Sequence, residues 1–232
     1  MYIKRAVEET VLSISDTFPV LLVTGPRQAG KSTMLEKLAT PERKIITLDD
    51  PDIRYLANQD PALFMQRFTP PVLIDEIQYA TNLLPYIKMA VDKSKKNGDY
   101  WLTGSQAFQM MKNVSESLAG RVGIVHLLGL STSEINAMPS EPFTTSPQWL
   151  MKRASTMPKM GLPEVFGRIF KGSMPRLYEK PETDWETYYR AYVDTYLQRD
   201  IRDLTQVADA MAFYNFMTVV AARTAKPIVY EE

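Results

Sequence analysis

The stretch Gly25-Pro26-Arg27-Gln28-Ala29-Gly30-Lys31-Ser32 (GPRQAGKS) decides the fold class of this chain. It fits the phosphate-binding pattern G-x-x-x-x-G-K-[ST]. The apolar residues 19–24 (PVLLVT) precede it and predict a buried strand, and residues 32–39 predict a helix. The pattern binds phosphate when a strand precedes it and a helix follows it, as predicted here. The alternative interpretation is a glycine turn that precedes a helix by chance.

The chemistry of this loop follows from its backbone. Glycines allow successive N–H groups to turn toward phosphate oxygens, and the positive end of the following helix points at the same anion. We expect Lys31 to reach the β- and γ-phosphates and the Ser32 hydroxyl to bind Mg²⁺. The residues expected to contact the nucleotide are Gly25, Pro26, Arg27, Gln28, Ala29, Gly30, Lys31, Ser32 and Thr33.

A second acidic motif follows about 44 residues after the loop lysine, in residues 71–76 (PVLIDE). An apolar strand that ends in acidic residues is typical of the metal-binding segment of such enzymes. We expect Asp75 to hold Mg²⁺ and Glu76 to polarise the water that attacks the γ-phosphate. The alternative is a buried strand followed by a solvated acidic turn.

Two further positions are candidates for catalysis. Ser105 and Gln106 follow the predicted strand 99–104, where a polar residue can contact the γ-phosphate or the attacking water. Ser105 as a helix N-cap is the alternative. Arg121, immediately before the predicted strand 122–128, is a candidate arginine finger for a neighbouring subunit, which would imply a homo-oligomer. The alternative for Arg121 is a structural pairing with a carboxylate or a helix C-terminus.

The order of predicted elements indicates an α/β fold. Strands alternate with helices, which predicts a mostly parallel sheet covered on both faces, a three-layer sandwich. Residues 2–16 predict an entry helix, and Asp-Pro pairs at 50–51 and 60–61 predict helix starts. We place the boundary of the nucleotide domain near residue 130. Residues 131–232 predict a smaller helical region, with a proline-rich loop at 138–160. The predicted strands are residues 19–24, 44–49, 72–75, 99–104 and 122–128.

Composition narrows the function classes. The 232 residues contain no cysteine and one histidine, which excludes cysteine chemistry and disfavours a histidine metal site. Lys plus Arg equals Asp plus Glu at 27 each, so no polyanionic partner is required. No apolar run approaches the roughly 20 residues that span a bilayer, and the N-terminus is too charged for a secretory signal. We therefore expect a cytoplasmic protein without a membrane partner.

Six motifs in order resemble a known family: GPRQAGKS, VLIDEIQ, WLTGSQ, SLAGRV, GSMPRL and YLQRDIRDL. Together they are similar to prokaryotic P-loop ATPases of the AAA+ superfamily that carry an uncharacterised C-terminal domain. The resemblance implies a five-stranded sheet of order 5-1-4-3-2 and a helical lid. It also implies that Pro175 and Arg176 lie near the nucleotide, because residues 172–175 resemble a Gly-x-Pro segment with one extra residue. Family members are longer, so we expect a truncated chain.

These observations predict Mg²⁺-dependent binding of ATP and its hydrolysis to ADP and phosphate, coupled to conformational change. One alternative is a slow nucleotide-dependent switch that an unknown partner protein reads. Another is a nucleic-acid-associated ATPase, against which the neutral charge balance argues. A GTPase is disfavoured because the sequence has no Asn-Lys-x-Asp segment.

Overall fold

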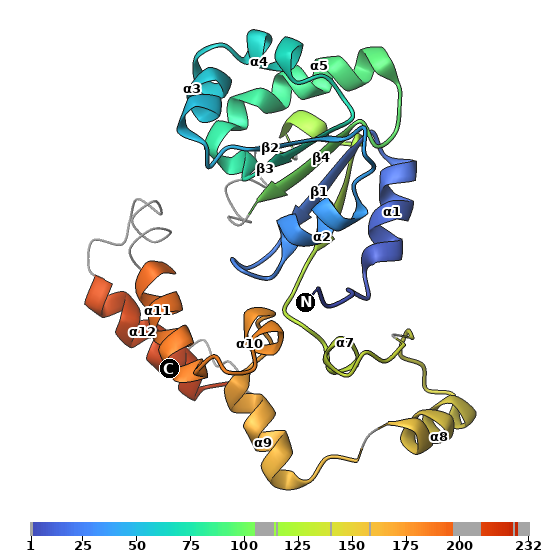
Figure 1. Ribbon diagram of the computed structural model, residues 1–232, viewed down its shortest axis with the longest axis vertical. Coiled ribbons are helices and arrows are strands. Elements are labelled where there is room, and N and C mark those ends of the chain that lie inside the picture. The colour runs from blue at the N-terminus through green and yellow to red at the C-terminus, as the bar shows by residue number, and fades with distance from the viewer. Residues whose placement is uncertain are drawn as a thin grey trace. The chain divides into compact units, whose positions relative to one another are not determined.

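The computed structural model describes residues 2–104, 114, 116–139, 141–157, 159–196, 210–224 and 226. It divides into two units, Met1–Pro181 and Glu182–Glu232. In the first unit all strand pairs are parallel, and the strands form one sheet in the order β2-β3-β4-β1-β5 (Figure 1). This order is the expected 5-1-4-3-2. The strands are β1 Val20–Thr24, β2 Lys44–Thr47, β3 Val72–Asp75, β4 Tyr100–Gly104 and β5 Val122–His126.

Helices cover both faces of the sheet, because alternate residues of each strand point to opposite faces. Val20 and Leu22 of β1 pack in one apolar layer with residues of α3, α4 and α5. Leu21 and Val23 pack in the opposite layer with residues of α1 and α2. Figure 1 shows these two groups of helices on either side of the strands. The helices are α1 Glu8–Thr17, α2 Lys31–Leu38, α3 Pro51–Gln59, α4 Pro61–Arg67 and α5 Leu84–Ser94, with a short helix η1 at Ile77–Leu83.

The two helix starts predicted from Asp-Pro pairs are present. The Asp50 carboxylate accepts a hydrogen bond from the backbone N–H of Asp52 (2.9 Å), and the Asp60 carboxylate accepts one from Leu63 (2.9 Å). A proline occupies the start of each helix, where the missing N–H costs nothing. Side-chain capping therefore separates α3 from α4.

The entry helix is shorter than its apolar spacing predicts, because α1 begins at Glu8. The Glu8 carboxylate accepts hydrogen bonds from the Arg5 backbone N–H (2.6 Å) and the Tyr2 hydroxyl (2.8 Å). These bonds fold the preceding residues into a turn that is incompatible with continuing the helix. Residues 2–6 form a non-helical segment that we call the N-terminal strap.

The chain after the sheet is helical in most of its described part. In the first unit the helices are α7 Thr132–Ile135, α8 Pro147–Thr156, α9 Leu162–Lys171 and α10 Arg176–Glu179; in the second they are α11 Trp185–Tyr196 and α12 Ala210–Ala222. Helix α8 lies within the predicted loop 138–160, because the Ser146 hydroxyl caps its N-terminus and Pro147 begins it. Among the residues described, none of the helices has the length and apolar character needed to cross a bilayer.

Candidate functional site

The glycine loop and Asp75, two of the predicted parts of the site, lie at one edge of the sheet. In a parallel sheet the carboxyl ends of neighbouring strands meet at the same edge, and ligands bind there. The glycine loop follows β1, Asp75 ends β3, and Thr103 is the penultimate residue of β4. The register that pairs Thr103 with Val23 brings the β4 end beside the glycine loop.

The backbone of the loop requires its glycines. Gly25 has φ 148°, and a Cβ atom there would lie 2.0 Å from the carbonyl oxygen of Leu127. Gly30 has φ 88°, in the left-handed region that favours glycine. Gln28 adopts φ 60°, which is uncommon for a residue with a side chain and is found where surrounding structure enforces it. The loop is therefore a tightly curled segment rather than an ordinary turn.

Lys31 lies with its side chain over this loop and is only 6% exposed. Its Nζ donates hydrogen bonds to the carbonyl oxygens of Gly25 (3.0 Å) and Pro26 (2.9 Å). A positive charge is thus held at the mouth of the curled backbone, where an anion entering the loop would meet it.

Asp75 is the centre of a cluster of hydroxyl groups. Its Oδ1 accepts hydrogen bonds from Ser32 Oγ and Thr103 Oγ1, both at 2.5 Å. Its Oδ2 accepts a longer bond from Thr47 Oγ1 (3.4 Å). The sequence predicted that Ser32 and Asp75 share a metal, and the fold brings their oxygens together.

This donor set suits Mg²⁺. The ion prefers oxygen ligands and is usually held by one or two protein groups, with water and substrate phosphates supplying the rest. Ser32 and Asp75 supply two such oxygens. Within the described part of the chain, no group of three or more His, Cys, Asp or Glu side chains gathers into an all-protein metal cage.

Thr103 is a site residue that the sequence analysis missed. Its hydroxyl donates to Asp75 and also accepts the backbone N–H of Glu76 (3.0 Å), and the residue is fully buried. One hydroxyl therefore orients both acidic residues. The signal in the sequence was a polar residue near the end of an apolar strand. The prediction named Ser105 and Gln106 instead, and both lie outside the described residues.

Glu76 adopts a left-handed backbone conformation, with φ 60° and ψ 47°. Such a conformation is costly for glutamate and persists only where neighbours hold it. The Thr103 hydroxyl holds its backbone N–H, and Gln78 Nε2 donates a hydrogen bond to its Oε2. The role of Glu76 as general base stays a prediction.

A cavity of about 290 Å³ adjoins the loop. Its walls come from the N-terminal strap, the loop and α2, and the start of α10. An ideal Cβ on Gly30 would lie 3.9 Å from Cγ of Pro175 and 3.8 Å from Nη1 of Arg5, so both residues border the loop. Pro175 and Arg176, expected near the nucleotide, both line this cavity, together with Tyr2, Ile3, Gln28 and Thr33.

Arg121 lies away from these groups, just before β5 begins and thus at the opposite edge of the sheet. Its Nε and Nη2 donate to Oδ1 and Oδ2 of Asp92 at 2.5 and 3.1 Å. The hydrogen bond from Arg121 lowers the pKa of the Asp92 carboxyl. This is the structural pairing that the sequence left open, and a role for Arg121 in a neighbouring subunit stays a prediction.

Comparisons with known proteins match two stretches of the chain. The model of the family described as AAA domain matches residues 17–136, and that of a domain of unknown function (DUF8612) matches residues 163–232. The uncharacterized proteins Rv2008c of Mycobacterium tuberculosis and Mb2031c of Mycobacterium bovis are each 30% identical over 188 residues, which is 80% of this chain. The chain spans 37% of the length of these relatives.

Two solved structures show weaker similarity. A Walker-type ATPase of Pyrococcus abyssi has 14% sequence identity and a TM-score of 0.48, covering 89% of this chain and 75% of that one. A chain from a structure of two coordinating Pif1 helicases on forked double-stranded DNA has 13% identity and a TM-score of 0.33, covering 59% and 51%.

Proposed function

Because the chain belongs to the AAA domain family, whose model matches residues 17–136, we propose that it is a Mg²⁺-dependent ATPase producing ADP and phosphate. The observation that carries this proposal is the meeting of the Ser32 and Thr103 hydroxyls on Asp75 Oδ1, both at 2.5 Å, beside the curled loop. This arrangement joins an anion-binding backbone to a pair of magnesium ligands at one sheet edge.

The proposed substrate pose uses both parts of the site. The phosphates lie against the N–H groups of residues 25–30 and the N-terminus of α2, with Lys31 at the β- and γ-phosphates. The base and ribose occupy the 290 Å³ cavity, where Tyr2, Ile3 and Pro175 supply aromatic and apolar walls.

In the proposed reaction, a water oxygen forms a bond to the γ-phosphorus, and the bond from that phosphorus to the β–γ bridging oxygen breaks. Glu76 accepts a proton from the water, and ADP leaves with the electron pair of the broken bond. Ser32 and Asp75 would hold Mg²⁺, whose charge would offset that of the phosphate oxygens. The loop and Lys31 position and stabilise the transferring group.

Two substitutions test this function. Lys31→Ala is expected to abolish ATP binding, whereas Glu76→Gln is expected to retain binding and lose about 10²–10⁴-fold in turnover. Titration calorimetry with Mg·ATP and phosphate release measure the two properties. Lys37→Ala and Glu36→Gln, exposed positions of the same helix α2, are matched controls. Unchanged turnover in both test variants would refute the proposal.

A slow nucleotide switch is the second candidate, and the Gln78–Glu76 hydrogen bond favours it. A carboxylate engaged by a neighbouring amide is less available to accept a proton from water, so the chemical step is slowed. A purified protein with tightly held ADP, a very low rate and a nucleotide-dependent change in hydrogen exchange would support the switch. Rapid multiple turnover by the isolated protein would exclude it.

A further inference from the structure

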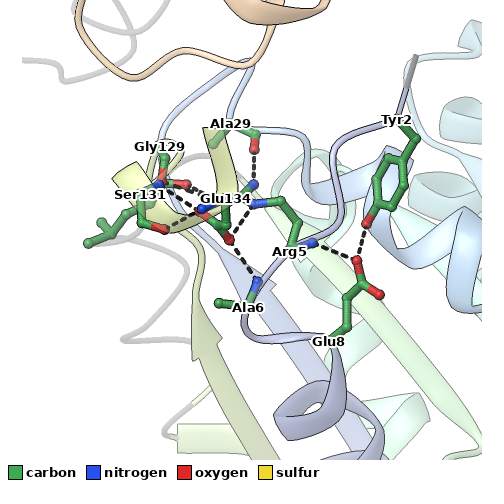
Figure 2. Close-up of polar contacts among 9 residues, drawn as sticks. Tyr2, Arg5, Ala6, Glu8, Ala29, Gly129, Ser131 and Glu134 are labelled. Carbon is green, nitrogen blue, oxygen red and sulfur yellow. Dashed lines mark hydrogen bonds and ion pairs between the residues drawn. The ribbon is translucent and has the colours of Figure 1, made fainter. Parts of the chain in front are cut away.

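Arg5 of the N-terminal strap joins three segments that are distant in sequence (Figure 2). It is 5% exposed. Its Nε donates to Glu134 Oε1 (3.0 Å), and its Nη1 donates to the carbonyl oxygen of Ala29 (2.8 Å). Its Nη2 donates to the carbonyl oxygens of Leu128 (2.8 Å) and Gly129 (3.2 Å). A single guanidinium therefore links the phosphate-binding loop to the chain that leaves the sheet.

The hydrogen bond from Arg5 to the Ala29 carbonyl fixes the backbone of the loop at a position outside the regular hydrogen bonds of β1 and α2. Ala29 lies between Gln28 and Gly30, which both have positive φ. In a planar trans peptide, the carbonyl of one residue and the N–H of the next point in opposite directions. Fixing the Ala29 carbonyl toward Arg5 therefore directs the Gly30 N–H away from Arg5.

Glu134 holds Arg5 from the other side. Its Oε1 also accepts the Ala6 backbone N–H (2.7 Å), and its Oε2 accepts the Ser131 N–H (2.6 Å). The Ser131 hydroxyl in turn accepts the Glu134 N–H, which completes a capping box for α7 (Figure 2). The carboxylate that neutralises Arg5 thus also caps the start of α7. Neither partner can move alone without breaking several hydrogen bonds, among them the buried Arg5–Glu134 bond.

We propose that Arg5 is a positioning residue for the phosphate-binding loop and that the Arg5–Glu134 pair couples the loop conformation to helix α7. This inference rests on the proposed nucleotide binding. A nucleotide that holds the loop in one conformation also favours the strap and α7 arrangement bonded to it, because linked equilibria are reciprocal.

A purely structural ion pair would behave differently. Its removal would lower the melting temperature of the free protein and of the nucleotide complex alike, and it would leave the affinity of the folded protein for ATP unchanged. A positioning pair changes the affinity itself and the response of α7 to nucleotide.

Affinity is measured by calorimetric titration with Mg·ATP on the full chain. Arg5→Met removes every side-chain donor and is expected to weaken binding by about tenfold, the effect of losing a charge-assisted hydrogen bond. Arg5→Lys is expected to weaken binding similarly, because one ammonium cannot reach both Glu134 and Ala29. Arg67→Met, at an exposed arginine of α4, is the matched control. Equal Kd values for wild type and folded Arg5 variants would overturn the inference.

Hydrogen–deuterium exchange of the wild type tests the coupling without a substitution. Helix α7 does not line the 290 Å³ cavity, so ATP-dependent protection of its amides reports coupling rather than contact. We expect ATP to protect both the loop and α7, and Arg5→Lys to retain loop protection and lose that of α7. If the wild type binds ATP and the amides of α7 are not protected, the proposed coupling is overturned. This result needs no variant, so it holds even if circular dichroism shows that the Arg5 variants do not fold. Wild type that binds no ATP would instead refute the proposed function.

Discussion

Replacing Thr103 with valine tests how the two acidic residues of the site are held. The threonine hydroxyl is buried, donates to Asp75 Oδ1 at 2.5 Å and accepts the Glu76 N–H at 3.0 Å. Valine keeps the branched shape of the side chain and removes both hydrogen bonds. The substitution therefore isolates the hydroxyl from the packing around it.

The magnitude follows from the two lost bonds. A hydrogen bond to a charged acceptor contributes about 1.5–3 kcal/mol, and a buried N–H left without a partner costs about 1–3 kcal/mol. Because Asp75 and Glu76 are only half-buried, water offsets part of this loss, and we expect about 2–4 kcal/mol less free energy of unfolding. For a unit of this size that corresponds to a fall of roughly 5–15 °C in melting temperature.

The turnover rate should also fall in the fraction of Thr103→Val protein that remains folded. Asp75 and Glu76 both lose the hydroxyl group that orients them. We expect at least a roughly tenfold lower kcat for ATP, measured by phosphate release well below the melting temperature of the variant. Thr103→Ser keeps the hydroxyl and should recover most of both properties. Thr17→Val, at an exposed threonine of α1, controls for the substitution itself. A Thr103→Val protein with wild-type melting temperature and kcat would show that this hydroxyl does not order the acids.

Three further predictions concern other polar contacts. Gln78→Ala should raise the single-turnover rate by about threefold or more, since it removes one hydrogen-bond donor from the Glu76 carboxylate, and an equal or lower rate would contradict that reading. Burial opposes ionisation of Glu134, but hydrogen bonds from backbone N–H groups and Arg5 outweigh it and lower its pKa. In denaturant titrations, the wild type should therefore have a larger free energy of unfolding than Glu134→Gln. This difference should be largest above the ordinary pKa of 4.5 and should shrink as the pH falls below it. Arg121→Ala should leave the melting temperature nearly unchanged, because exposed ion pairs contribute little. If Arg121 serves a neighbouring subunit, the same substitution should abolish any rise of specific ATPase rate with protein concentration, and an unaltered rise would exclude that role.

Much of the fold could be predicted from local patterns. The strand, glycine loop and helix around residues 19–39 are set by consecutive residues, and the structure has them as β1, the loop and α2. Asp50 and Asp60 signal their helix starts within a few residues of chain. The strand order followed from the resemblance of six motifs to a family, since pairing of distant strands leaves no local mark. Family similarity thus supplied what periodicity alone could not.

Apolar spacing failed where polar side chains compete for the same stretch of chain. Ile3 and Val7 have helical spacing, yet Glu8 captures the Arg5 N–H and the Tyr2 hydroxyl and the helix begins later. Arg121 similarly has a partner, Asp92, on another element. Apolar spacing shows neither outcome. The Glu8 bonds span only three and six residues but depend on side-chain geometry, whereas Asp92 meets Arg121 only in the folded chain.

The sequence by itself determined the strands of the sheet and the chemical types at the site: the curled loop, Lys31, Ser32, and an acidic strand end at Asp75. Only the tertiary structure decided which polar groups meet them. Thr103 bonds Asp75 from 28 residues away through the parallel arrangement of β3 and β4, and Arg5 pairs with Glu134 across 129 residues. Propensities and apolar periodicity act over a few residues. The register of the sheet and the closure of the chain determine which distant donors and acceptors are buried together and must therefore satisfy each other.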